Sequence, residues 1–261
     1  MVRRTIEKTI EATGRSLHSG RPCSVRLAPA DSGTGRRFNG ASIGPGMLAD
    51  SAFATTLLTP RGSVSTVEHL FAALHGLRID DIDISTEDGE LPIFDGSARC
   101  WVNLLSPAEH PGASAEPLIV GEKLRVGDDQ SWIVVEPDCH LSINVAVDFP
   151  ALGGFRFHAT AEQWGHAIDA RTFGFLADAE HLNAMGLALG ATLDNTLVFD
   201  EDRVLNTNGL RFDDEVARHK WLDFFGDLYT LGRPVIGRFT AYRSGHRLHH
   251  ELVKALSKLA T

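Results

Sequence analysis

Residues 210–229 read LRFDDEVARHKWLDFFGDLY. Apolar side chains recur in this stretch with the spacing of an amphipathic helix, at Val216, Trp221, Leu222, Phe225 and Leu228. The spacing predicts a helix from about Asp214 to Tyr229. Asp213 or Asp214 would be its N-cap, with a carboxylate near the positive end of the helix dipole.

Two polar side chains on this predicted helix have the spacing of metal ligands. His219 and Asp223 lie four residues apart, so they project from one face, and Asp227 extends the row by another turn. A His and a carboxylate so placed form half of a metal site, because both reach one ion without bending the backbone. A solvated helix with an ordinary His–Asp pair would show the same spacing, so the rest of the chain must decide.

Composition limits the class of protein. The chain has 261 residues, enough for one large domain or two of ordinary size, and a formal net charge of −9. That charge argues against nucleic-acid binding, because the acidic residues outnumber the basic ones, 34 to 25, and no excess of cations is left to neutralise phosphates. Three scattered cysteines form no disulfide framework and fit buried thiols in a reducing compartment. No signal peptide and no run of about 18 apolar residues is found, so we expect a cytoplasmic protein.

The chain divides near its middle. Residues 106–117, SPAEHPGASAEP, contain three prolines and no periodicity, which predicts a linker between a domain at 1–110 and another at 116–261. Strand patterns followed by helical patterns in each part indicate two α+β units of similar layering rather than a doubly wound parallel sheet. The predicted elements are, in order, strands in 4–11 and 24–27, a capping box at 65–68, a helix at 69–75, a strand at 81–86, a strand followed by a turn and a helix in 91–101, strands at 132–136 and 141–149, helical stretches at 161–168 and 173–185, strands at 196–199 and 234–242, and a helix at 251–259.

A second histidine motif offers a candidate for the third ligand of the predicted metal site. His69 follows Glu68 in the first turn of a predicted helix, and it would complete a set of two His and one Asp with His219 and Asp223. Such a set leaves one coordination position open, as in a catalytic zinc site. Glu68, beside the ligand, would take a proton from the attacking water. A capping Glu beside a core His remains the alternative.

Two further residues are candidates on weaker grounds. His246 lies in a predicted turn, SGHR, and catalytic residues often lie on loops; an exposed His in a His-rich tail is the alternative. Thr172, in ARTFGF, is a hydroxyl that could equally be an ordinary residue at a strand end.

Several stretches together are similar to one family. They are EATGRSLHSG, STVEHLFAALHGLRIDDIDI, LPIFDGSA, ARTFGFL, GLRFDDEVARHKWLDFFGDL and FTAYRSGHRLHHEL, and they run from near the first residue to near the last. In this order they resemble the UDP-3-O-acyl-N-acetylglucosamine deacetylases, the zinc enzymes of lipid A synthesis. The motifs VEH, HKxxDxxGDL and SGH are separately informative and jointly very specific.

The resemblance implies a role for each candidate residue. It makes His69, His219 and Asp223 the ligands of one Zn²⁺ per chain, with Fe²⁺ as a possible substitute. It makes Glu68 the general base and His246 the general acid. The remaining implied roles are Asp227 orienting His246, Thr172 binding the oxyanion, and Lys220 as a cation near the substrate.

The resemblance also implies an architecture. The family has two layered α/β-sandwich domains of the α+β class, each with an insert, and the active site lies between them. The insert of the second domain, about 172–200, would form an apolar passage for the acyl chain of the substrate. Its expected lining, for which ordinary helix packing is the alternative, comprises Phe173, Leu176, Leu182, Leu187 and Leu189.

Some segments depart from the family pattern. Glu136 stands where relatives commonly have a lysine that helps bind the nucleotide diphosphate, and the loop before Ser65 and the segment at 148–159 are shortened. These departures permit a zinc deacetylase of the same fold that acts on another N-acetyl sugar. An inactive protein that binds a lipid-linked sugar nucleotide is a second alternative, but a degenerated site would usually have lost one of the residues Glu68, His69, His219, Asp223, Asp227 and His246, and all are present. For the main interpretation we expect an acylated UDP-sugar as substrate, no nucleic acid, at most transient contact with a membrane surface, and a monomer.

Overall fold

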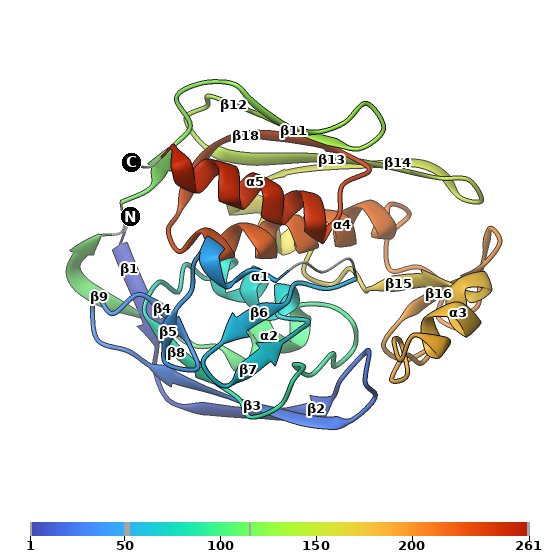
Figure 1. Ribbon diagram of the computed structural model, residues 1–261, viewed down its shortest axis with the longest axis horizontal. Coiled ribbons are helices and arrows are strands. Elements are labelled where there is room, and N and C mark those ends of the chain that lie inside the picture. The colour runs from blue at the N-terminus through green and yellow to red at the C-terminus, as the bar shows by residue number, and fades with distance from the viewer. Residues whose placement is uncertain (1, 50–52, 115, 260–261) are drawn as a thin grey trace.

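The computed structural model describes residues 2–49, 53–114 and 116–259, and it has the expected mixed α+β fold. Helices occupy the middle of the molecule, with one large sheet above them and another below (Figure 1). The central helices are α1 (Glu68–Gly76), α2 (Arg99–Leu104), α4 (Glu215–Leu228) and α5 (His246–Lys258). None of the helices in these ranges has the length and apolar character that crossing a bilayer requires.

The sheet of the N-terminal half has five strands. Their order is β2 (Ile10–Arg15), β3 (Pro22–Pro29), β8 (Ile82–Ser85), β4 (Arg36–Phe38) and β5 (Ala41–Ser42). Buried and exposed residues alternate along β3, as expected for a strand with one face on a core. Small elements complete this half: β1 (Val2–Ile6), the 3-10 helix Pro45–Met47, and the hairpin of β6 (Leu57–Thr59) and β7 (Gly62–Val64).

The sheet of the C-terminal half has six strands. The main path is β11 (Leu124–Gly127), β12 (Trp132–Glu136), β18 (Val235–Tyr242), β13 (Leu141–Phe149) and β14 (Gly153–Thr160), and β10 (Leu118–Ile119) pairs with β18. A separate small sheet joins β15 (Phe173–Phe175), β16 (Leu197–Asp200) and β17 (Arg203–Val204). Beside it lie the 3-10 helix Leu176–Asp178 and α3 (Ala179–Ala184), and 3-10 turns also occur at Ala161–His166 and Tyr229–Leu231.

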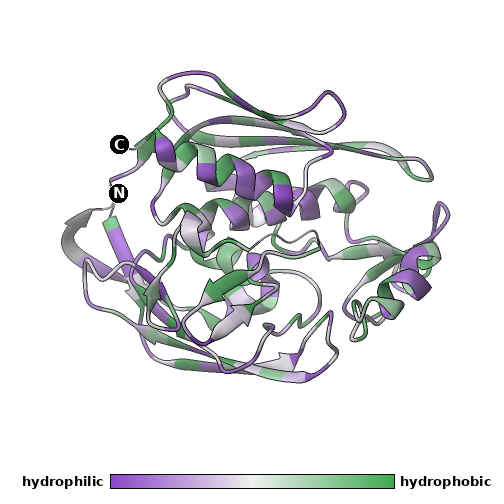
Figure 2. Ribbon diagram, in the orientation of Figure 1, coloured by the Kyte–Doolittle hydropathy of each residue, from purple (hydrophilic) through white to green (hydrophobic). Residues whose placement is uncertain are grey.

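Helix α5 is amphipathic, whereas α4 is buried on nearly all sides, with Arg218 and Lys220 half-buried. Apolar and polar residues are interspersed along both helices (Figure 2). The buried residues of α4 include Val216, Trp221, Leu222, Phe225 and Leu228, as the periodicity predicts. Asp214 lies at the N-cap position, but its carboxylate accepts from Arg218 Nε at 2.5 Å instead of capping the backbone.

A glycine lets α1 and α4 approach closely. A Cβ atom at Gly226 would lie 2.2 Å from the backbone oxygen of Glu68, so no larger residue fits there without moving the helices apart. This contact brings Glu68 and His69 of α1 beside the polar face of α4. The otherwise unfavourable helical glycine is therefore explained by packing.

Replacing Gly226 with alanine should lower the free energy of unfolding by about 1–3 kcal/mol, as overpacking typically does. It should also lower activity, because it would separate α1 from α4. Thermal unfolding and turnover together would measure this. Gly165→Ala is the matched control, since nothing lies within 4 Å of a Cβ atom at this residue of the 3-10 helix Ala161–His166. Equal melting temperatures for both variants would contradict the packing argument.

Several predictions about elements are wrong. The predicted linker at 106–117 contains strand β9 (Pro107–Ser114), which pairs with β1 at the edge of a two-stranded sheet. Proline is tolerated at the first residue of such a strand. The boundary between domains at this place stays a prediction. No strand forms from Leu91 within the described residues, and the predicted helix 173–185 divides into β15, a 3-10 turn and the short α3.

Three other local expectations also differ from the structure. The capping box at Ser65–Glu68 does not form: Val67 is the N-cap, and the Glu68 carboxylate accepts the backbone N–H of Thr55 at 3.0 Å. The closing helix begins earlier than predicted, so His246 is its first residue and does not lie in a turn. Of the cysteines, Cys23 is buried, whereas Cys100 is half-buried and Cys139 is exposed.

Candidate active site

A cavity of about 190 Å³ lies between the N-termini of α1 and α5 and the middle of α4. Most of the predicted site residues line it, although they come from distant parts of the sequence. The lining residues are Leu17, Phe53, Thr66, Glu68, His69, Ile93, Thr172, Phe173, His219, Lys220, Asp223, Gly245 and His246.

The three predicted metal ligands converge at this cavity. The Nε2 atoms of His69 and His219 lie 3.8 and 3.3 Å from Asp223 Oδ1, and one donor atom from each residue lies within 4.8 Å of the others. All three are buried. Among the residues that the structure describes, Asp223 Oδ1 has no hydrogen-bond partner. A buried carboxylate oxygen without a partner, facing two imidazoles, fits a divalent cation such as zinc.

The protonation states suit metal binding. Burial, together with the charge of His219, lowers the pKa of His69 to about 3, so its imidazole is neutral. Burial also lowers the pKa of His219, whose Nδ1–H donates to the Ala170 carbonyl at 3.1 Å and leaves Nε2 free to act as a ligand. Burial would raise the pKa of Asp223, but His219 and Lys220 outweigh it and keep that pKa below its usual range.

The predicted base and acid face each other across the cavity. Glu68 Oε1 lies 3.8 Å from His246 Nε2, which lies 3.9 Å from Asp223 Oδ2. Burial raises the pKa of Glu68 to about 7, which suits a general base at neutral pH. Burial works to lower the pKa of His246, but the charges of Asp227 and Glu68 prevail and raise it to about 9. His246 is therefore protonated at neutral pH.

Asp227 is hydrogen-bonded to the ring of His246. Its Oδ2 atom lies 2.8 Å from His246 Nδ1 and 2.7 Å from His249 Nδ1, and its Oδ1 atom accepts a short hydrogen bond from Thr55 Oγ1. The Thr55 hydroxyl also lies 2.8 Å from His250 Nε2. This network fixes the orientation of His246 and directs its Nδ1–H to the Asp227 carboxylate.

Sequence reasoning did not select three members of this network. His249 and His250 follow His246 by three and four residues, which places them on its side of a helix. Extending the closing helix back to His246 would have identified them. Thr55 has no local signal, because folding brings it to Asp227 across 172 residues of sequence.

The two substrate-facing candidates also line the cavity. Lys220 Nζ lies 2.8 Å from Asp223 Oδ2, and although burial would lower the pKa of Lys220, Asp223 raises it, so the ammonium stays charged. Thr172 is half-buried, and its backbone N–H donates to the Gly96 carbonyl at 2.7 Å. Both side chains can therefore approach a bound ligand.

Most of the residues predicted to line the acyl-chain passage do not line this cavity. Among the described residues that line the cavity, Phe173 is the one member of that predicted set. Leu176 and Leu189 are 47% and 53% exposed, and Leu182 and Leu187 are half-buried. These leucines are thus not packed in a helix core, which leaves them available to an apolar ligand. The passage itself stays a prediction.

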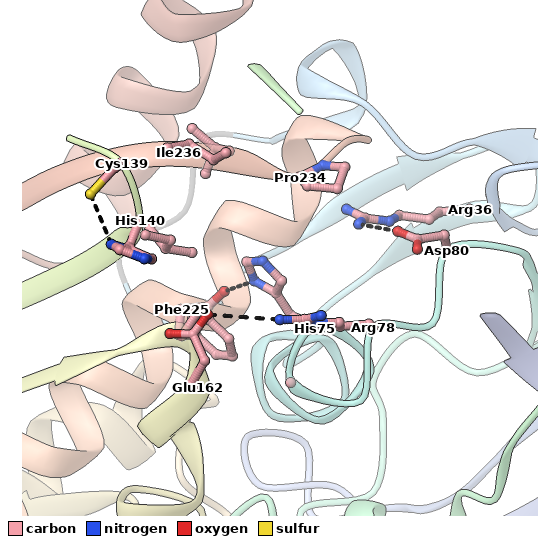
Figure 3. A pocket seen from close by; sticks show the side chains of 14 residues that line it. Arg36, His75, Arg78, Asp80, Cys139, His140, Glu162, Phe225, Pro234 and Ile236 are labelled. Carbon is pink, nitrogen blue, oxygen red and sulfur yellow. Dashed lines mark hydrogen bonds and ion pairs between the residues drawn. The ribbon is translucent and has the colours of Figure 1, made fainter. Parts of the chain in front are cut away.

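A second cavity, of about 300 Å³, lies at the opposite ends of α1 and α4 (Figure 3). His75 stacks on Phe225 there and its Nδ1 atom donates to the Phe225 carbonyl at 2.8 Å. Its lining, over the described residues, includes none of the predicted catalytic residues. The cavity that the predicted catalytic residues line is therefore the smaller of the two.

Known proteins match nearly the whole length of the chain. A family model described as UDP-3-O-acyl N-acetylglycosamine deacetylase (LpxC) matches residues 3–258. Proteins named UDP-3-O-acyl-N-acetylglucosamine deacetylase from Haemophilus influenzae (strain 86-028NP) and Shewanella sp. (strain W3-18-1) are 40% and 39% identical to it over 97% of this chain and 89% of their own. The protein from Shewanella oneidensis is also 39% identical, with the same coverage. The chain therefore belongs to the UDP-3-O-acyl-N-acetylglucosamine deacetylase family.

Proposed function

We propose that this protein is a zinc-dependent hydrolase that removes the N-acetyl group of UDP-3-O-[(R)-3-hydroxyacyl]-N-acetylglucosamine and releases acetate, a step of lipid A biosynthesis. The observation that carries the proposal is the convergence of a His, His, Asp ligand set with a base and an acid in one cavity. The identity of the substrate is inferred from the family to which the chain belongs.

The proposed metal is zinc, one ion per chain, held by His69, His219 and Asp223. The same donors would accept Fe²⁺, but two imidazoles and one carboxylate with an open position are typical of catalytic zinc. Such an ion supplies Lewis-acid activation of water and polarisation of the amide carbonyl. The ligand geometry would form without large rearrangement, because the donor atoms already lie within 4.8 Å of one another.

The protein side chains move the protons. Ionised Glu68 accepts a proton from the water that attacks the acetamide carbonyl. Protonated His246, oriented by Asp227, donates a proton to the departing amine nitrogen. Lys220 and the Thr172 hydroxyl stabilise the negative charge that develops on the carbonyl oxygen. Two separate groups thus perform the two proton transfers.

The pH dependence of kcat/KM should be bell-shaped. Activity requires ionised Glu68, so it should rise with pH up to a pKa of about 7, and a bound cation would move this limb lower. It also requires protonated His246, so it should fall above a pKa of about 9. Steady-state rates from pH 5 to pH 10 test this. A descending limb that persists unchanged in His246→Gln would contradict its assignment to this residue.

Comparing substrates tests the proposed specificity. Acetate release from UDP-3-O-acyl-N-acetylglucosamine should far exceed release from free N-acetylglucosamine. The comparison is needed because Glu136 stands where the family resemblance implies a lysine that binds the diphosphate. The Glu136 carboxylate lies 3.1 Å from Arg238 Nη2 and 3.3 Å from Lys123 Nζ, so two cations offset its negative charge. Equal rates for the two sugars would favour a deacetylase acting on another N-acetyl sugar.

The setting of the enzyme follows from this activity. We propose that it works as a monomer in the cytoplasm, where UDP-sugars are made, and that it contacts a membrane surface at most transiently. The substrate is a small amphipathic molecule, and no nucleic-acid partner is proposed. Size-exclusion chromatography with light scattering would test the monomer, since a dimer would double the mass.

A further inference from the structure

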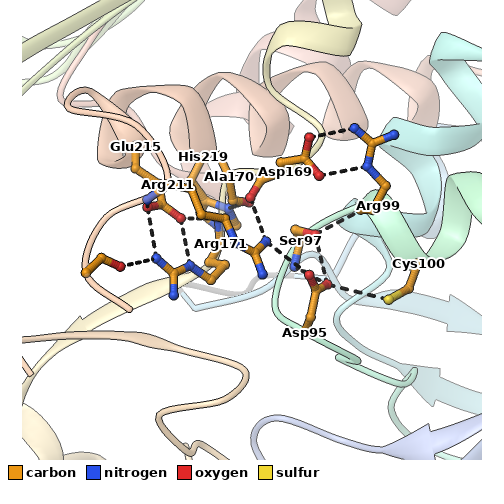
Figure 4. Close-up of polar contacts among 11 residues, drawn as sticks. Asp95, Ser97, Arg99, Cys100, Asp169, Ala170, Arg171, Arg211, Glu215 and His219 are labelled. Atoms are coloured by element: carbon orange, nitrogen blue, oxygen red, sulfur yellow. Dashed lines mark hydrogen bonds and ion pairs between the residues drawn. The ribbon is translucent and has the colours of Figure 1, made fainter. Parts of the chain in front are cut away.

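Residues 168–172, called here the 168–172 segment, run beside the proposed metal ligands (Figure 4). The segment is also hydrogen-bonded to the N-terminal half, where the Ala98 N–H donates to the Ile168 carbonyl at 3.1 Å and the Gly96 carbonyl accepts from the Thr172 N–H at 2.7 Å. The Ala170 carbonyl accepts a hydrogen bond from His219 Nδ1 at 3.1 Å. Thr172, at the other end, lines the catalytic cavity. The segment therefore contacts the metal site through its backbone and the cavity through a side chain.

A buried ion pair fixes this segment to the helix that carries the ligands. Arg171 donates from Nε to Glu215 Oε1 at 2.8 Å and from Nη2 to Glu215 Oε2 at 3.1 Å. Its own backbone N–H donates to the same Oε1 atom at 3.1 Å. Glu215 is the first residue of α4, and the two side chains are 6% and 0% exposed. A bidentate pair removed from water holds its partners in one geometry.

The Glu215 carboxylate also accepts a hydrogen bond from the loop before α4. The backbone N–H of Arg211 donates to Glu215 Oε2 at 2.6 Å, and Arg171 Nη2 also donates to the Gly209 carbonyl at 2.8 Å. Hydrogen bonds from Arg171 and Arg211 outweigh burial and keep the pKa of Glu215 below its usual range. The loop before α4, the start of α4 and the 168–172 segment are thus held together at one point.

A second attachment joins the segment to the N-terminal half. Arg99 of α2 donates from Nε and Nη2 to the Asp169 carboxylate at 2.7 and 2.5 Å, and Arg211 Nη1 bridges Asp95 Oδ2 at 3.0 Å and the Asp169 carbonyl at 2.8 Å. The Arg99–Asp169 side chains are 40% and 34% exposed, so water screens this pair more strongly. The buried pair is therefore the stronger constraint.

We propose that the Arg171–Glu215 pair positions the metal site. It holds the 168–172 segment so that the Ala170 carbonyl keeps hydrogen on His219 Nδ1, which leaves the Nε2 lone pair for the metal. It also keeps the Thr172 hydroxyl at the cavity. Because neither side chain touches the reacting atoms, both are positioning residues. This inference rests on the proposed metal site and deepens it.

Glu215→Gln tests the pair while keeping the size of the side chain. Zinc should leave this variant for a chelator roughly 10–100-fold faster than it leaves the parent, as is typical when an outer partner of a ligand is disturbed. Its kcat should fall with little change in KM, because Thr172 is assigned to the transition state. Release is followed with a chromogenic chelator.

Asp80→Asn is the matched control. It removes the carboxylate of another buried pair, Arg36–Asp80, with Nη2 and Oδ1 at 3.0 Å, whose arginine donates to the Tyr229 carbonyl beyond the end of α4. This variant should melt at a lower temperature but release zinc within twofold of the parental rate. If release is accelerated as much as in Glu215→Gln, the effect is general destabilisation and the inference is overturned.

Arg171→Lys covers the case in which Glu215→Gln does not fold. It keeps the positive charge but loses the forked hydrogen bonds, so zinc release should again accelerate. A folded variant of either kind with parental zinc release and parental kcat would overturn the inference. A parent protein that takes up no zinc would instead overturn the proposed metal site, and this is measured before either variant.

Discussion

Replacing His219 with alanine should yield a folded protein that holds no zinc at micromolar metal and releases no detectable acetate. The substitution removes one of the three proposed ligands, and it leaves Asp223 Oδ1, already without a partner among the described residues, facing a single imidazole. His219 is buried at the cavity and hydrogen-bonded to the Ala170 carbonyl through Nδ1, so the substitution removes an imidazole that is already oriented for binding. Metal content and acetate release are measured on the same sample.

His158→Ala is the control for this substitution. His158 is exposed on β14 and pairs across the sheet with Asn144, so its loss should change neither metal content nor turnover. A His219→Ala protein that retains one zinc per chain would show that the ligand set is different. Equal loss of activity in both variants would point to the handling of the protein and not to the site.

Replacing Glu68 with glutamine should lower kcat by roughly 10²–10⁴-fold, the usual contribution of a general base, while zinc stays bound. The amide keeps the shape of the side chain, and its carbonyl can still accept the Thr55 N–H that now bonds to Oε2 at 3.0 Å. What it loses is the ability to take a proton. The rising limb of the pH profile should disappear with it.

Turnover and metal content of Glu68→Gln are compared with those of Glu122→Gln. Glu122 is exposed in the segment before β11, so its amide variant should behave as the parent. Full activity in Glu68→Gln would refute the assignment of the base. Loss of zinc together with activity would instead make Glu68 a ligand or a support of one.

From the sequence alone we selected residues that the fold brings together in one cavity, because these residues lie in local patterns. His219, Asp223 and Asp227 are spaced by one helical turn, and this helix forms as predicted, within a residue or so at each end. His69 and Glu68 are adjacent in sequence, so one motif located both. The family resemblance, which the comparisons confirm, assigned their roles.

Long-range contacts could not be predicted in this way. Thr55 reaches Asp227, and Arg171 reaches Glu215 across 44 residues, only after the chain has folded. Local rules also failed where tertiary contacts override them. Strand β9 forms in a proline-containing segment because β1 supplies its hydrogen bonds, and the capping box at Ser65 is absent because Glu68 bonds to Thr55 instead.

The most direct test of the central claim is acetate release from UDP-3-O-acyl-N-acetylglucosamine by the purified protein before chelation, after chelation and after addition of zinc. The account predicts one zinc per chain at the start, loss of acetate release when a chelator removes it, and recovery on adding one equivalent back. Acetate release that continues unchanged in the metal-free protein would contradict a reaction centred on His69, His219 and Asp223.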